Sequence, residues 1–220
     1  KKIVTAAGIA AGTAAVASLY AYVTIKALID TALDREMPKV MEKADKRISG
    51  EKSSDEFTNR MESASESLAV QPNETVEIIA HDGEKLVGHY FPCEKPERVI
   101  IAFHGWRSSW HRDFGMISDF WYKNNCSVLY VEQRGQNNSS GEYMGFGLTE
   151  RFDCLDWLNW EIERCGSDIP VYLAGVSMGA TTVLMAAGLQ LPPNVHGIMA
   201  DCGFTSANAI WEHIAKDNLH

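Results

Sequence analysis

A serine framed by two glycines is the feature of this sequence with the clearest chemical potential. Gly175-Val176-Ser177-Met178-Gly179 directly follows the apolar run 171–174 and opens a helical pattern that reaches about residue 189. A sharp strand-to-helix turn needs small residues two positions on either side of the serine, and it projects the hydroxyl clear of the backbone. The helix N-terminus then points N–H groups and a positive dipole end toward it. This context predicts that Ser177 is a nucleophile and that Gly175 and Gly179 shape its turn.

A second motif, His104-Gly105-Trp106, follows the apolar run 99–103. In sites of this kind the oxyanion is held by one backbone N–H of such a loop and one from the residue after the nucleophile. We therefore expect the Trp106 and Met178 N–H groups to form an oxyanion hole, each worth about 3 kcal/mol of barrier lowering. His104 and Gly105 are interpreted as shaping the loop, rather than His104 as the base. For the aromatic side chains of Trp106, Trp110 and His111, lining of an acyl pocket and ordinary packing stay open.

The elements that must position these motifs alternate along the chain from residue 72 onward. Runs at 75–80 and 85–91 flank a turn signal at 81–84, which predicts an antiparallel hairpin. Apolar strand-like runs then alternate with helical patterns; the strands are expected at 99–103, 127–131, 171–174 and 197–200, and the helices at 108–124, 148–164, 178–189 and from about 205. Continuous apolar strands separated by helices are typical of a parallel sheet covered on both faces. The predicted fold class is α/β.

Taken together, these motifs resemble the α/β-hydrolase superfamily over roughly residues 72–220. The closest likeness is to small, singly anchored bacterial members related to serine aminopeptidases and acylglycerol lipases. In those relatives an RGHG-x-S-x-G-like loop stands where this chain has residues 134–141, and here Gln136 replaces the usual histidine. Residues 201–206 are also similar to the relatives. The resemblance implies a serine hydrolase that acts on an ester, lipid or peptide-like small molecule, without a metal or cofactor.

A serine nucleophile also needs a general base and an acid that orients it. In this fold an Asp or Glu and then a His follow the serine in chain order, and the resemblance places them after later strands that this sequence does not contain. Downstream of Ser177 the histidines are His196, His213 and His220, and Asp201 comes one strand early. We therefore expect a fold truncated after the fourth parallel strand. A missing C-terminal segment or a second chain would complete it, because an apolar edge strand invites pairing.

The N-terminal part differs in character from the rest of the chain. Residues 3–25 carry no charge and are long enough to cross a bilayer as a helix. A retained signal-anchor and a cleaved signal peptide are the two interpretations, and the length of the apolar run favours the anchor. We expect a transmembrane signal-anchor over 1–27, a helical stalk over 28–71 and the hydrolase-like domain over 72–220. The lysines at the front indicate that the domain lies outside the cytoplasm.

Composition excludes some classes of function. A net charge of −9 argues against nucleic-acid binding, which favours a basic face. The five cysteines form no C-x-x-C pair, and no Cys/His cluster has the spacing of a zinc site. Two alternatives to an enzyme stay open, because fold alone does not establish activity. One is a membrane-tethered binding protein with an incomplete triad, and the other is an inactive remnant.

Overall fold

The computed structural model describes residues 2–36 and 55–218, which belong to two compact units, Lys1–Lys52 and Ser53–His220. In the first unit, helix α1 (Lys2–Leu33) contains the predicted membrane span. Most side chains of that span lie outside the described residues, as does much of the predicted stalk. Across the part of the chain that the structure describes, no helix is both long and apolar enough to cross a membrane. The signal-anchor over residues 1–27 stays a prediction from the sequence.

The second unit is built on a sheet of six strands in the order β1-β2-β4-β3-β5-β6. The strands are β1 (Glu74–Ile79), β2 (Lys85–Phe91), β3 (Arg98–Phe103), β4 (Cys126–Glu132), β5 (Val171–Val176) and β6 (Val195–Asp201). The pairs β1–β2 and β2–β4 are antiparallel, whereas β4–β3, β3–β5 and β5–β6 are parallel. This arrangement confirms the predicted class, a mostly parallel α/β sheet that begins with an antiparallel hairpin.

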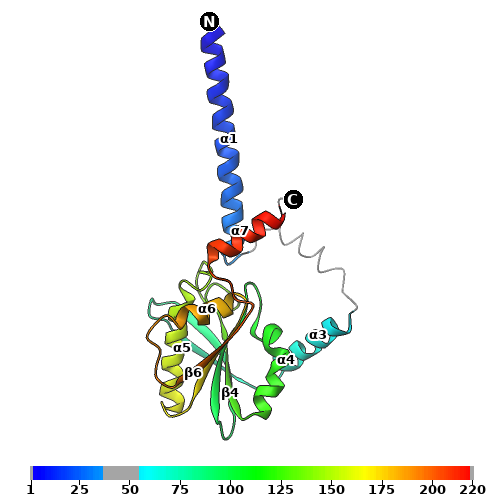
Figure 1. Ribbon diagram of the computed structural model, residues 1–220, viewed down its shortest axis with the longest axis vertical. Coiled ribbons are helices and arrows are strands. Elements are labelled where there is room, and N and C mark those ends of the chain that lie inside the picture. The colour runs from blue at the N-terminus through cyan, green and yellow to red at the C-terminus, as the bar shows by residue number, and fades with distance from the viewer. Residues whose placement is uncertain (1, 37–54, 219–220) are drawn as a thin grey trace. The chain divides into compact units, whose positions relative to one another are not determined.

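Among the described residues of this unit, the helices are α3 (Glu56–Ala69), α4 (Trp110–Lys123), α5 (Glu150–Cys165), α6 (Met178–Ala186) and α7 (Ala207–Asn218). Helices α3 and α4 lie on one side of the sheet, and α5 and α6 lie on the other (Figure 1). The last strand, β6, is an edge of the sheet, and its Met199 side chain is 41% exposed. An apolar edge at this strand matches the sequence-based expectation, while its completion by another segment stays a prediction.

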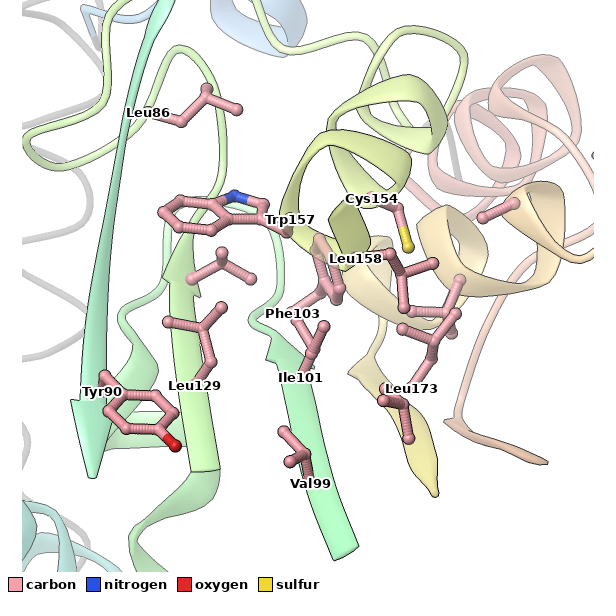
Figure 2. Close-up of a cluster of buried hydrophobic side chains, with 14 of the residues drawn as sticks. Leu86, Tyr90, Val99, Ile101, Phe103, Leu129, Cys154, Trp157, Leu158 and Leu173 are labelled. Atoms are coloured by element: carbon pink, nitrogen blue, oxygen red, sulfur yellow. The ribbon is translucent and has the colours of Figure 1, made fainter. Parts of the chain in front are cut away.

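Side chains alternate along β3, so this strand contributes to the hydrophobic clusters on both faces of the sheet. Val99, Ile101 and Phe103 point into the cluster formed with α5 and α6, where Trp157 is the largest buried side chain (Figure 2). Ile100 and Ala102 point to the opposite face and pack with α3 and α4. Successive strand residues face opposite sides of a sheet, so a strand covered on both faces must be apolar throughout. Both motifs of the candidate site follow strands of this buried kind.

A buried carboxyl group on α5 gives a pH-dependent prediction. Glu161 is 1% exposed, and neither of its oxygens has a hydrogen-bond partner among the described residues. Burial raises the pKa of Glu161, and the nearby Cys165 thiol and Arg164 guanidinium offset this only in part. Since the folded pKa lies above the unfolded pKa, the stability linked to this proton is present below the unfolded pKa. It is lost as the pH rises through the folded pKa.

Replacing Glu161 with Met is therefore expected to stabilise the protein by about 1–3 kcal/mol near neutral pH, because it removes a buried acid without partners. Near pH 4, where the wild-type carboxyl is protonated, the gain should be smaller. Glu161→Gln is the control that removes the titration but keeps a polar group. Urea unfolding across pH measures both effects. A gain for Glu161→Met that does not change with pH would contradict the assignment.

Candidate active site

Ser177 occupies the turn between β5 and α6, in a conformation that non-glycine residues rarely adopt. Its φ is +52° and its ψ is −112°. The Ser177 N–H donates to the Asp201 carbonyl at 2.9 Å, and the Ser177 carbonyl accepts from the Thr181 N–H at 3.1 Å. Such a backbone conformation costs on the order of 1–3 kcal/mol and persists where the surroundings enforce it. The strand on one side and the helix on the other hold this strained serine in place.

The two glycines of the motif are required by the close approach of backbone segments. A Cβ atom on Gly175 would lie 2.3 Å from the Gly179 carbonyl oxygen, and a Cβ on Gly179 would lie 1.9 Å from the Phe103 carbonyl oxygen. Real Cβ atoms do not approach other heavy atoms so closely. The absence of side chains at both positions lets the start of α6 pack directly on the end of β3, which brings the serine turn to the loop after β3.

The loop that follows β3 lies beside the serine. A Cβ on Gly105 would be 3.4 Å from the Ser177 Cβ, so the two backbones are neighbours. The Gly105 N–H donates to the Asp113 carboxylate at 2.7 Å, and the Arg107 N–H donates to Gln136 Oε1 at 2.6 Å. Trp106 therefore stands between two anchored backbone groups. On the other side, Met178 begins α6, where the first-turn N–H groups have no intrahelical acceptor.

His104 is buried and engaged through both ring nitrogens. Its Nδ1 donates to the Gly105 carbonyl at 2.8 Å, and its Nε2 accepts from the Gln133 N–H at 3.3 Å. Burial lowers the pKa of His104, which favours the neutral ring. A ring that is fixed between two backbone groups is not available as a proton acceptor for Ser177. The His104 ring joins the loop after β3 to the loop after β4, and its loop-shaping role stays a prediction.

Backbone strain gathers at the carboxyl ends of the parallel strands. Among the described residues, four of the non-glycine positions with positive φ each follow one of these strands: Arg107 (+49°) after β3, Asn137 (+50°) after β4, Ser177 (+52°) after β5 and Cys202 (+48°) after β6. Open α/β sheets bind ligands at this edge, and strained conformations cluster at functional sites. The candidate site therefore lies at the edge where a functional site of this fold is expected.

The aromatic side chains considered for an acyl pocket separate into two groups. Trp110 is buried on the α4 face of the sheet, stacked on His89 at 4.4 Å and on Tyr130 at 5.6 Å between ring centroids. His111 Nδ1 lies 2.9 Å from Ser65 Oγ of α3. These two side chains pack the core and the α3–α4 interface, so ordinary packing explains them. Trp106 instead contacts a cluster beside the site, made of Phe146, Phe204 and Trp211.

The structure does not bring a histidine to the nucleophile within the residues it describes. The Ser177 hydroxyl makes no hydrogen bond with a histidine side chain in this part of the chain. His196 lies on β6, 6.4 Å from Tyr172 between ring centroids, and His213 lies on α7. The Asp201 side chain is exposed, and its backbone carbonyl receives the Ser177 N–H. His220 lies outside the described residues.

One group of side chains in the described part of the chain has the spacing of a metal site. The ligand atoms of His81, Asp153 and Asp156 all lie within 4.8 Å of one another. His81 Nδ1 is 2.9 Å from Asp156 Oδ2, while both Asp153 oxygens accept from the Arg134 guanidinium. Arg134 also pairs with Asp82 at 2.7 Å. The Arg134 guanidinium already occupies both oxygens of Asp153, so we assign the Asp153–Arg134–Asp82 ion pairs a structural role in holding the loop after β4.

Residues that hold the site in place were missed by reasoning from the sequence. Asp113 binds the loop after β3 through the Gly105 N–H and, at 2.6 Å, through the Ser108 hydroxyl. Gln133 and Asn137 contact the same loop from the loop after β4. An acidic residue in the first turn of the helix after a glycine loop is a signal that points to Asp113. The amides give no signal, because they pair with segments distant in sequence.

Comparison with known proteins places this geometry in a fold class. No family model matches the chain, and no curated protein matches it. Among solved structures, an esterase from Pyrococcus furiosus is similar with 22% identity and a TM-score of 0.58, over 69% of this chain and 56% of that chain. An alpha/beta hydrolase from a Penicillium species is similar with 20% identity and a TM-score of 0.54, over 68% of this chain and 53% of that chain.

These likenesses show that the second unit has the α/β-hydrolase fold. The described strands supply the hairpin and the four parallel strands of the predicted architecture, up to β6. The matched regions span little more than half of the similar solved chains. Resemblance to a membrane-anchored, aminopeptidase-like or lipase-like branch stays a prediction from the sequence.

Proposed function

We propose that this protein is a serine hydrolase that cleaves a carboxylic ester or a peptide-like acyl bond through an acyl-enzyme on Ser177. The single observation that carries the proposal is the strained Ser177 turn, which only Gly175 and Gly179 permit and which lies beside the Gly105 backbone. Selection for stability alone would not retain a positive φ at a serine. A need to present its hydroxyl at the ligand-binding edge of the sheet accounts for the strain.

The reaction follows from this geometry. The Ser177 Oγ attacks the carbonyl carbon, its proton passes to a general base, and the electrons of the carbonyl bond move to oxygen. In the proposed reaction, the Trp106 and Met178 N–H groups stabilise that oxyanion. Its collapse expels the alcohol or amine, which takes up the proton, and water then releases the acid from Ser177. A histidine and an acid must supply the proton transfers, and no residue among those described is assigned these roles.

The proposed substrate class is supported by the aromatic side chains that gather around Trp106. The Trp106 ring lies 5.9 Å from Trp211, and Phe146 lies 5.5 Å from Trp211 between ring centroids. Phe204 is tied to α6 because its N–H donates to Thr181 Oγ1 at 3.0 Å. Aromatic side chains favour contact with apolar groups. We therefore propose an ester, lipid or peptide-like small molecule with an apolar acyl or alcohol part as the substrate.

The second candidate function is non-catalytic binding, by a protein that keeps the fold without a working triad. The observation that favours it is that the Ser177 hydroxyl has no histidine partner in the described part of the chain. A labelling experiment with a fluorophosphonate on the natural full-length protein separates the two functions. We expect labelling of the wild type and of Ser167→Ala, a matched exposed serine, and none of Ser177→Ala. An unlabelled wild type that is folded would favour the binding protein.

A further inference from the structure

Three amide side chains join the loop after β4 to the loop after β3. Gln133 Nε2 donates to the His104 carbonyl, Gln136 Oε1 accepts from the Arg107 N–H at 2.6 Å, and Asn137 Nδ2 donates to the Ser108 carbonyl at 3.0 Å. Each of these three bonds joins an amide to a backbone group of the loop after β3. The backbone of the loop after β3 is thus fixed along its length from one side. We call Gln133, Gln136 and Asn137 the amide clamp.

The clamp also reaches the helix that carries the nucleophile. Thr182 of α6 donates its hydroxyl to Gln133 Oε1 at 2.9 Å. Gln133 is 3% exposed, so water competes little for these bonds. One side chain therefore links the loop after β3 and the helix that begins after Ser177. Since the expected oxyanion donors come from this loop and this helix, Gln133 fixes one relative to the other.

Gln136 is the member whose chemistry is most informative. It is 6% exposed, its Oε1 accepts from the Arg107 N–H, and its Nε2 is buried with no hydrogen-bond partner among the described residues. A buried donor without a partner is uncommon and calls for an explanation. What Gln136 contributes is therefore its acceptor oxygen, Oε1. This oxygen binds the N–H of Arg107, whose φ is +49°.

From these contacts we propose that Gln136 is a positioning residue that aims the Trp106 N–H at the oxyanion formed on Ser177. The Asp113 carboxylate fixes the Gly105 N–H on one side of Trp106, and Gln136 fixes the Arg107 N–H on the other. The two bonds together set the direction of the peptide group that joins Gly105 to Trp106, which carries the Trp106 N–H. The inference rests on the proposed hydrolase function and deepens it. Small errors in the aim of such a donor are costly, because its stabilisation depends on short, direct geometry.

The test compares two substitutions in the natural full-length protein. Gln136→Met keeps the size of the side chain and removes the acceptor; we expect kcat to fall about 10- to 100-fold with KM within about threefold. Gln136→Glu keeps an acceptor oxygen. Its activity relative to wild type should be near normal at low pH, where the buried carboxyl is neutral. It should fall as the pH rises, because a buried anion opposes the oxyanion. Gln190→Met, at an exposed glutamine, is the matched control.

The outcomes separate the positioning role from a structural one and from the proposed function itself. Fluorophosphonate labelling taken to completion counts the competent sites, so kcat is expressed per labelled Ser177. A normal kcat per site for Gln136→Met, or a loss shared equally by Gln136→Glu at all pH values, would overturn the positioning role. Failure of the wild type to be labelled or to hydrolyse any ester would instead overturn the proposed function.

Discussion

Replacing Gly179 with Ala is expected to destabilise the protein by about 3–5 kcal/mol, a large part of the total stability of a domain. The new Cβ would lie 1.9 Å from the Phe103 carbonyl oxygen and 2.7 Å from that of His104. These backbone atoms cannot move away from the added Cβ, because β3 is hydrogen-bonded between β4 and β5. The start of α6 must therefore separate from the sheet, which also moves Ser177.

Urea unfolding of the Gly179→Ala variant measures this loss. Gly188→Ala is the matched control, since the nearest atom to its added Cβ is the Met185 carbonyl oxygen at 3.3 Å. It is expected to change the free energy of unfolding by less than about 1 kcal/mol. If Gly179→Ala unfolded at the same urea concentration as the control, the close packing of α6 on β3 would be refuted.

Substitution of Ser177 is expected to have the largest effect on activity. Ser177→Ala and Ser177→Gly should each lower the rate of ester hydrolysis by on the order of 10⁴-fold or more, because no other hydroxyl stands in the turn. The two variants should differ in stability. At a φ of +52° a glycine relieves the strain and alanine does not. We expect Ser177→Gly to be more stable than both Ser177→Ala and wild type by about 1 kcal/mol.

Hydrolysis rates and urea unfolding, measured on the same preparations, test both parts of this expectation. A gain in stability at the cost of activity is the signature of a strained catalytic residue. A Ser177→Gly variant no more stable than Ser177→Ala would show that the turn is not strained. Residual hydrolysis near the wild-type rate in either variant would remove Ser177 from the reaction.

Much of the fold was predictable from local patterns. The run 99–103 and the strand β3 (Arg98–Phe103) differ by one residue, and the helix expected at 108–124 is α4 (Trp110–Lys123). Buried strands are apolar throughout and end at glycine or polar residues, which makes their limits easy to locate. The order of the strands in the sheet was harder to predict from the sequence. Nothing in the local sequence requires β2 to pair with β4, because that contact depends on packing across the whole sheet.

The candidate site was predictable only in part. The positions of Ser177, Gly175 and Gly179 follow from a motif whose sterics are local. The placement of Trp110 also had a local signal, since with Phe114 and Trp121 it repeats at helical spacing and forms the buried face of α4. The hydrogen bonds of Gln133 and Gln136 had no local signal in the sequence, because an amide can pair with any backbone group that the fold brings near.

The most direct test of the account is the chemical state of Ser177 during turnover. The natural full-length protein is mixed with a short-chain p-nitrophenyl ester, quenched in acid within the first turnovers, and digested for peptide mass spectrometry. We expect the peptide with Ser177 to carry the acyl group, and we expect Ser177→Ala to lose both the adduct and the hydrolysis. Hydrolysis of the ester with the acyl group on another residue, or with undiminished rate in Ser177→Ala, would contradict it.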